Sequence, residues 1–146
     1  MYKETAIFIP RILSFECPTC PEEIKKKHCV SNGYFCFTPP AAEIAERYPN
    51  ITEEYLLREN VREKCIYEIL GDEDDEWNDH SFFGYLHMMK YACLLHESNH
   101  DQCADVAMDI YSIDKVKVNE CMDSSFRTHG DWDSYNDMLA DDRDII

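Results

Sequence analysis

The chain has 146 residues, the size of a single domain that can bury a substantial hydrophobic core. It carries 30 acidic and 14 basic residues, which gives a net charge of −16 at pH 7. A surface this anionic repels nucleic-acid phosphates and anionic lipid headgroups, so the composition argues against DNA, RNA and membrane-surface binding and favours basic partners.

The first expected elements are short. Residues 6–16 are rich in branched and aromatic side chains and predict strand structure, which Pro10 interrupts. A helix is expected to begin between Cys17 and Pro21, with two glutamates at its positive end. Residues 30–40 (VSNGYFCFTPP) predict a turn and a short strand that ends at the two prolines.

From Asn50 onwards the pattern is helical. Asn50 and Glu53 resemble a capping box, and Gly71 is the expected end of the first long helix. An acidic loop is expected over 72–79, and further helices over 81–95, 101–113 and 114–122, the last of them capped by Asp114. The residues expected to face the core are Leu57, Val61, Cys65 and Ile69 in the first long helix, and Phe82, Phe83, Leu86, Met89 and Cys93 in the next.

Eight cysteines are many for a cytosolic domain of this length. An even number at short spacings is typical of a disulfide framework formed in an oxidising compartment, so we expect a luminal, secreted or cell-surface protein. The sequon Asn50-Ile51-Thr52 fits that environment and makes Asn50 the predicted glycosylation site. We recognise no signal peptide and no run of about 18 apolar residues, and therefore expect a mature or excised part of a longer protein.

The stretch Cys17-Pro18-Thr19-Cys20 lies where the predicted strand passes into the predicted helix. Thiol–disulfide enzymes place a C-x-x-C there because a helix N-terminus lowers the pKa of the first thiol. In such an enzyme Cys17 attacks and Cys20 resolves. A structural disulfide is the alternative, and we favour it because no proline follows the later helices to form the loop that faces a thioredoxin-type pair.

Residues 96–100 (HESNH) match H-E-x-x-H, in which His96 and His100 on a helix would bind zinc and Glu97 would act as base. Turn-forming residues fill this stretch, which lies between Cys93 and Cys103, and no convincing third ligand follows. We therefore interpret the match as accidental and predict no metal site.

Two further patterns have ordinary explanations. The acids of residues 131–142 recur like those of a calcium loop, but Tyr135 and Asn136 stand where an EF-hand needs an oxygen ligand and glycine. We expect a solvated acidic segment there and over 72–79. Four aromatic residues allow two interpretations, an aromatic recognition surface or core packing, and core packing explains them as well or better. They are Trp77, Phe82, Phe83 and Tyr85.

Several stretches together resemble one protein family. They are CPTCPEEIKKKHCVSNGYFC at 17–36, ENVREKCIYEIL at 59–70, the acidic turn with its tryptophan, and YAC at 91–93 followed by DQCADVAMDIYSIDKVKVNECM at 101–122. They are similar to the central luminal region of plant-type vacuolar sorting receptors and their protist homologues. The resemblance extends from about Phe15 to Met122, and all eight cysteines fall in the family's order.

Members of this family are type I membrane receptors that bind sorting signals on soluble hydrolases. The resemblance implies a partial thioredoxin-like fold with a large disulfide-bonded helical insertion, and so an α+β class that is predominantly helical. In the family, a strand with a proline loop, another strand and a helix come after the matched part. We therefore expect residues 1–123 to hold the thioredoxin-like start and the insertion, and residues 124–146 to be an acidic polar tail, irregular or with one weak helix, that leads to the absent part.

The disulfide pairing does not follow from the sequence, because eight cysteines allow many connectivities. Our hypothesis takes the shortest plausible loops, which gives Cys17–Cys20, Cys29–Cys36 and Cys93–Cys103 and leaves Cys65 for Cys121. In the chain-entropy model the last bridge closes the longest loop and contributes about 4 kcal/mol.

Our leading hypothesis is a non-enzymatic luminal or extracellular domain that recognises, or helps to recognise, soluble protein cargo without a cofactor. The first alternative is a thiol–disulfide oxidoreductase that uses Cys17 and Cys20. The second is a structural ectodomain component of a cell-surface or ciliary assembly. The expected location is the lumen of the Golgi, endosome or vacuole, or the cell surface, with membrane attachment only through a span outside this chain.

Overall fold

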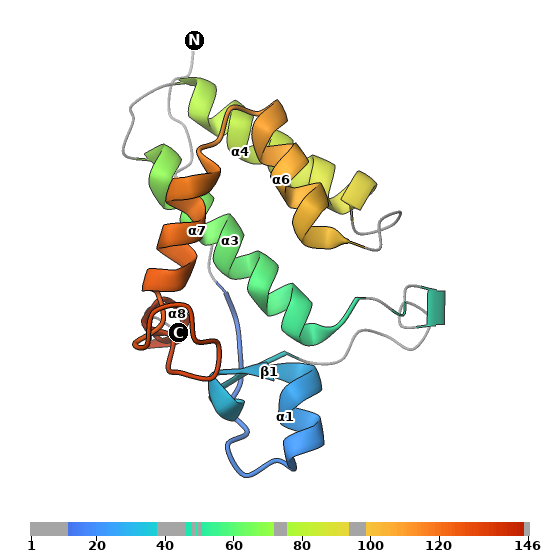
Figure 1. The fold of residues 1–146 in the computed structure, drawn as a ribbon, viewed down its shortest axis with the longest axis vertical. Helices are drawn as coiled ribbons and strands as arrows, with labels where there is room; N and C mark the ends of the chain where they lie inside the picture. Colours follow the sequence, from blue (N-terminus) through green and yellow to red (C-terminus); the bar gives the residue numbers. More distant parts are fainter. Residues whose placement is uncertain are drawn as a thin grey trace.

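The computed structural model describes residues 12–37, 46–47, 49, 51–71, 76–93 and 99–144. In Figure 1, helix α1 and a β-hairpin lie at one end of the molecule, two helices lie side by side at the other end, and a long helix runs between them. The elements in chain order are α1 (Glu22–His28), β1 (Cys29–Val30), the 3-10 turn η1 (Ser31–Gly33), β2 (Phe35–Cys36), α3 (Glu53–Gly71), α4 (Glu76–Met88), the π-helical turn η2 (Met89–Cys93), α6 (His100–Ile110), α7 (Lys115–Ser124) and α8 (Asp137–Asp144).

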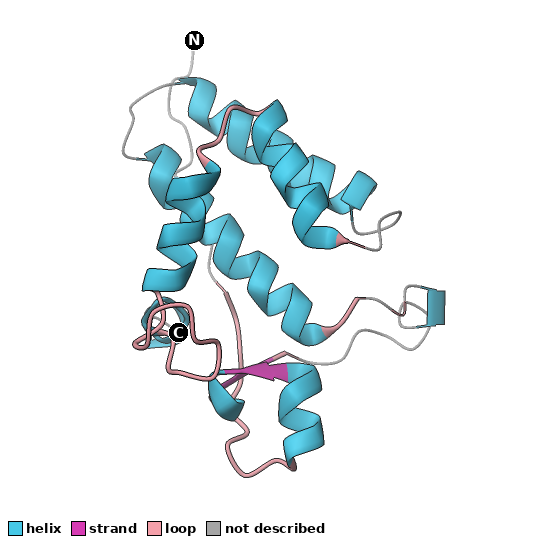
Figure 2. Ribbon diagram, in the orientation of Figure 1, coloured by secondary structure: helices cyan, strands magenta, loops and turns pink. Residues whose placement is uncertain are grey.

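The N-terminal part consists of α1 and the small sheet (Figure 2). Helix α1 begins after Pro21 and carries two glutamates in its first turn and three lysines and a histidine in its last, and the lysine charges complement the helix dipole. Strands β1 and β2 pair antiparallel across η1, and Phe15 forms a single bridge with Cys36 on the other side of β2. A strand was expected over 6–16. Its described residues, 12–16, form this one β-bridge and no longer strand.

Helix α3 is the centre of the molecule, and α7, α4 and α1 all contact it. It begins at Glu53, where the Thr52 hydroxyl accepts a hydrogen bond from the main-chain N–H of Tyr55 at 3.1 Å. Thr52 therefore caps the helix, and Asn50, which was expected to form a capping box with Glu53, lies outside the described residues. The helix ends at Gly71 as predicted. Of the expected inward stripe, Leu57, Val61 and Cys65 are buried and Ile69 is partly buried.

Helix α4 begins at Glu76, inside the segment that was expected to be an acidic loop, and passes into η2 at Met89. Phe82, Tyr85, Met89 and Cys93 are buried, whereas the side chain of Phe83 is 50% exposed. The prediction that Phe83 faces the core is therefore wrong. Phe82, Tyr85 and Met89 stand three and four residues apart and share one face, and Phe83 is turned about 100° away from Phe82.

The remaining helices complete the core. Asn99 caps α6 by accepting a hydrogen bond from Gln102, and Asp114 caps α7 as predicted, accepting from the main-chain N–H groups of Val116 and Lys117. The segment after α7 returns to the body, where Leu139 of α8 is fully buried in the same cluster as the side chains of α3, α4, α6 and α7.

The fold is thus α+β and mainly helical, as the sequence predicts. No helix among the described residues combines the length and the apolar character that crossing a membrane would require.

Candidate functional site

Four disulfides pair all eight cysteines. The bridges are Cys17–Cys20 before α1, Cys29–Cys36 across the hairpin, Cys65–Cys121 between α3 and α7, and Cys93–Cys103 between η2 and α6. These are the pairs that the shortest-loop hypothesis gives. Each of the last three joins two elements, so the framework fixes the hairpin and holds the helices together.

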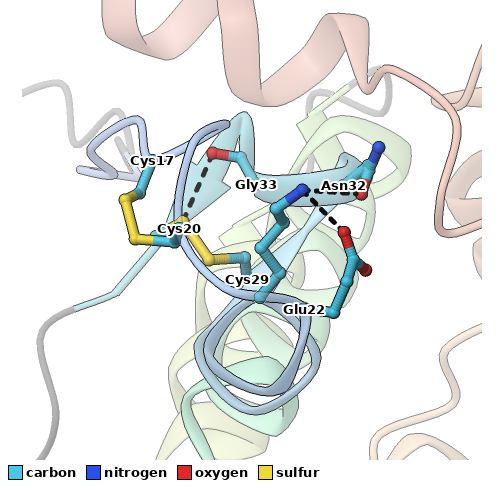
Figure 3. The surroundings of a disulfide bond; sticks show 8 residues. Cys17, Cys20, Glu22, Cys29, Asn32 and Gly33 are labelled. Carbon is cyan, nitrogen blue, oxygen red and sulfur yellow. Dashed lines mark hydrogen bonds and ion pairs between the residues drawn. A yellow bond between two sulfur atoms is a disulfide. The ribbon is translucent and has the colours of Figure 1, made fainter.

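The bridge between Cys17 and Cys20 differs from the other three because both of its cysteines are partly exposed. Figure 3 shows it beside Gly33. The main-chain oxygen of Gly33 accepts a hydrogen bond of 2.7 Å from the N–H of Cys17. The N–H of Cys20 in turn donates to the oxygen of Cys17 at 3.2 Å. These bonds form a tight turn that holds the pair against the hairpin.

The position of this pair relative to α1 differs from that of a redox catalyst. Helix α1 begins only at Glu22, after Pro21, so that both cysteines precede its first turn. Glu22 and Glu23 occupy that turn, and acidic residues there offset the positive end of the helix dipole that would favour a thiolate. This geometry favours a structural role for the bridge.

The hairpin turn beside the bridge has an uncommon backbone. Ser31, Asn32 and Gly33 have consecutive positive φ angles of 53°, 54° and 94°. At Gly33 a Cβ atom would stand 2.6 Å from the main-chain oxygen of Cys17, so glycine is required both for the backbone angle and for this close approach. The turn thus depends on its contact with the Cys17–Cys20 segment.

A cleft of about 590 Å³ opens between α1, the hairpin turn, the start of α3 and the loop that follows α7. Glu22, Lys25, Lys26, Cys29, Val30, Asn32, Glu54, Trp132 and Asp133 line it. One wall carries the ammonium group of Lys25, which contacts Glu22 at 2.9 Å and Asn32 at 3.5 Å (Figure 3). An indole ring in a cleft with charges of both signs is suited to bind a ligand with both apolar and polar groups.

A second hollow of about 310 Å³ lies between the first turns of α3 and α6. Its lining consists of Thr52, Glu54, Tyr55, Arg58, Asn99, His100 and Asp101. Glu54 therefore lines both hollows, and the guanidinium of Arg58 lies over the ring of Trp132, 4.8 Å from its centre. The two hollows consequently adjoin along the N-terminal half of α3.

A buried polar network supports the floor of this region. Arg62 pairs with Glu59 and also with Asp101, and the hydroxyl of Tyr85 donates to Glu59 at 2.6 Å. Burial raises the pKa of Glu59, opposed by the Arg62 guanidinium and the Tyr85 hydroxyl, and burial likewise raises the pKa of Tyr85. Although burial acts in the opposite direction, the hydrogen bond from Arg62 leaves the pKa of Asp101 below its usual value.

The scan against protein-family models identifies the family. The model of the vacuolar sorting receptor thioredoxin-like domain matches residues 2–145. The chain belongs to this family. No curated protein and no solved structure matches the chain. The suspected kinship is thereby confirmed, and the match extends beyond the resemblance seen from Phe15 to Met122.

In this vacuolar sorting receptor domain, His100 is the first residue of α6 and its ring lies 4.1 Å from that of Tyr55. His96 and Glu97 lie outside the described residues. Asp142, from the acidic stretch, is buried and pairs with Lys64, so the stretch is not simply solvated. No group of three residues that could hold a metal ion occurs in the described part of the chain.

The aromatic residues that the sequence singled out lie elsewhere. Phe82 and Tyr85 are core residues, which confirms the packing explanation for them, and the side chain of Trp77 lies outside the described residues. Among the residues of the two hollows, sequence reasoning singled out neither Trp132 nor Arg58. A lone tryptophan in the polar run DWDS was the available signal, because such a residue needs an apolar partner or a ligand.

Proposed function

We propose that this vacuolar sorting receptor domain is a non-enzymatic, luminal or extracellular protein-recognition domain that binds, or helps to bind, soluble protein cargo. The observation that carries the proposal is the family match over residues 2–145, because a sorting receptor acts by recognising other proteins. The four disulfides support the location, since such a framework persists where thiols are oxidised.

The charge of the domain indicates the kind of partner. A net charge of −16 attracts basic protein surfaces and raises their association rate at low salt. Binding to cargo should therefore weaken as the salt concentration rises, because the contributing charges are exposed.

The experiment uses the oxidised protein immobilised on a biosensor, and soluble vacuolar or lysosomal hydrolases as analytes. We expect reversible binding whose affinity falls as the salt concentration is raised from about 50 to about 300 mM, because salt in this range increasingly screens exposed charges. An acidic protein of similar charge and unrelated fold serves as control for unspecific attraction. If no hydrolase binds better to the domain than to this control, cargo recognition by the domain is refuted, and a structural ectodomain role is favoured.

A thiol–disulfide oxidoreductase is the second candidate, favoured by the partial exposure of Cys17 and Cys20. The placement of both cysteines before α1 and the two glutamates of its first turn speak against it. An insulin-reduction assay decides between the two, with Cys17→Ser as control. We expect the same background rate for both proteins, and a rate that depends on Cys17 would establish the enzyme.

We further propose that Asn50 is N-glycosylated in the secretory pathway. The sequon Asn50-Ile51-Thr52 and the disulfide framework support this proposal, although Asn50 itself lies outside the described residues. Peptide-N-glycosidase F should lower the apparent mass of protein secreted from eukaryotic cells, and Asn50→Gln should remove that change. An unchanged mass of the wild type would contradict the modification.

A further inference from the structure

We propose that the two adjoining hollows form one peptide groove, which takes an extended segment of a protein partner and seats a nonpolar side chain on Trp132. This inference rests on the proposed function and deepens it, because it names the surface and the chemistry of the segment. The groove is defined as the cleft beside α1, the hollow at the start of α6 and the ridge formed by Glu54 and Arg58.

The continuity of the groove favours a polypeptide over a small ligand. Glu54 lines both hollows, and Arg58, one helical turn further along α3, connects them by lying over Trp132. Each hollow has a volume typical of a binding pocket, about 590 and about 310 Å³. Two such hollows side by side fit successive side chains of one extended chain.

Trp132 is preorganised as an anchor. Its ring packs against Phe126 at 4.5 Å and under the guanidinium of Arg58 at 4.8 Å. Its main-chain oxygen accepts a 2.7 Å hydrogen bond from the N–H of Ser31, which fixes the loop to the hairpin turn. The ring is nevertheless only partly buried. The part of this rigid indole that stays exposed offers apolar contact without the cost of ordering a flexible side chain.

The charges of the first hollow define the residues that flank the apolar anchor. Lys26 is exposed and makes no ion pair among the described residues, whereas the Lys25 ammonium in the same wall is paired with Glu22 at 2.9 Å. A carboxylate of the partner fits this wall. Glu54 and Asp133 present carboxylates to the same cleft, and a lysine or arginine of the partner fits them. The segment is thus one with a nonpolar residue between an acidic and a basic residue.

The backbone of the hairpin turn is consistent with a binding role. Asn32 lines the cleft, and it lies within the run of three positive φ angles from Ser31 to Gly33. Non-glycine residues in this region cost free energy and are retained where the surroundings impose them, often at ligand sites. The same turn holds Trp132 through Ser31, so the strained backbone and the anchor form one unit.

The test uses Trp132 as its own reporter. In a Trp77→Phe background it is the sole tryptophan, because the chain has two. The probe is a positional-scanning library of acetylated and amidated heptapeptides. We expect the pools with a nonpolar residue flanked by Asp or Glu on one side and Lys or Arg on the other to change Trp132 emission and to compete with one another.

Variants of the groove then locate the binding. Trp132→Ala should lower the affinity for the selected peptide at least tenfold, measured by fluorescence polarisation of a labelled peptide. Lys26→Glu should lower it several-fold and reduce its salt dependence. Phe83→Ala removes another half-exposed aromatic ring, on α4, and should leave the affinity unchanged. Trp132→Phe, which keeps an aromatic ring, should retain most of the affinity and guards against misfolding of the alanine variant.

Two results overturn the groove: selected peptides that bind Trp132→Ala and wild type equally, or a high-mannose glycan that binds through Trp132 when no peptide does. Failure of the groove is distinguishable from failure of the proposed function. If hydrolases bind Trp132→Ala and Lys26→Glu as tightly as wild type, the groove falls while cargo recognition stands. If peptides bind in the groove but no hydrolase binds the domain, the groove stands and cargo recognition falls.

Discussion

Lys64 and Asp142 form a buried ion pair that connects the middle of α3 to the last helix, α8. The side chain of Lys64 is 9% exposed and that of Asp142 is fully buried. The second carboxylate oxygen of Asp142 accepts a 3.0 Å hydrogen bond from the N–H of Ile12. Three segments that are distant in the sequence therefore meet at one carboxylate, and the acidic end of the chain is part of the core.

Asp142→Asn should destabilise the domain strongly. The substitution removes the charge that compensates the buried Lys64 ammonium, and breaking a buried pair from one side costs about 3–5 kcal/mol. The free energy of unfolding is measured by urea denaturation of the oxidised protein. Asp109→Asn is the matched control, because Asp109 pairs with Lys115 on the surface at 3.0 Å, where solvent screening makes such a pair contribute little. Equal losses in the two variants would contradict the role assigned to the buried pair.

The four disulfides should differ in how readily they are reduced. Cys17–Cys20 is partly exposed at both ends, whereas Cys65 and Cys93 are fully buried. A mild phosphine reductant followed by alkylation and peptide mapping should therefore label Cys17 and Cys20 first. Initial labelling of Cys65 and Cys121 would show that accessibility does not control reduction.

Loss of the same bridges should have unequal effects on stability. In the chain-entropy model, removal of Cys65–Cys121 by paired alanine substitutions costs about 4 kcal/mol, because the bridge spans 56 positions. Removal of Cys17–Cys20 by paired serine substitutions costs about 2 kcal/mol or less, because it spans only 3. Thermal unfolding of the two variants measures the order, and the reverse order would contradict the model.

The parts of this domain that sequence reasoning predicts are those set by local chemistry. The Asp114 cap and the end of α3 at Gly71 depend on residues within a few positions of each other. The inward stripe of Leu57 and Val61 follows from helical periodicity alone. The shortest-loop scheme also gives the pairs that the structure contains, because its three short loops leave Cys121 as the partner of Cys65.

The parts that sequence reasoning missed depend on tertiary contacts. Asp142 looks like a solvated acid until Lys64, 78 positions away, is placed beside it. Trp132 lies in an acidic run, and its neighbours Arg58 and Ser31 come from distant segments. Phe83 is the exception, because helical spacing from Phe82, Tyr85 and Met89 already places it on another face of α4. Local pattern contains no information on the distant partners of Asp142 and Trp132, which is why the cleft was not predicted.

Gly33→Ala should destabilise the hairpin end of the molecule. An added Cβ would approach the main-chain oxygen of Cys17 to 2.6 Å at a φ of +94°, so the backbone must shift. The expected loss is on the order of 2 kcal/mol, measured by urea denaturation. Gly71→Ala is the matched control, because it replaces a glycine at a helix end where an added Cβ meets nothing within 4 Å. A loss at Gly71 as large as at Gly33 would refute the steric explanation.

Glu63 should make the stability of the domain fall as the pH rises through neutrality. Its burial, with the Glu59 carboxylate as a second cause, raises the pKa of Glu63 to about 8, opposed by Arg62. Between the unfolded pKa near 4.5 and this value, the native state binds the proton and the unfolded state releases it. Stability therefore decreases with pH in this window, with a limiting slope of about 1.4 kcal/mol per pH unit.

Glu63→Gln should remove this component, because the amide does not titrate. The free energy of unfolding is measured by urea denaturation at several pH values between 5 and 8.5, a range of roughly the width of the titration. As the pH rises, the free energy of unfolding of the variant should increase relative to that of wild type. Since Glu63 is only partly buried, we expect a gain on the order of 1 kcal/mol across the range rather than the limiting value. Glu68→Gln, at an exposed position of the same helix, is the control for the substitution itself. Parallel curves for Glu63→Gln and wild type would mean that Glu63 is ionised in the folded domain at neutral pH.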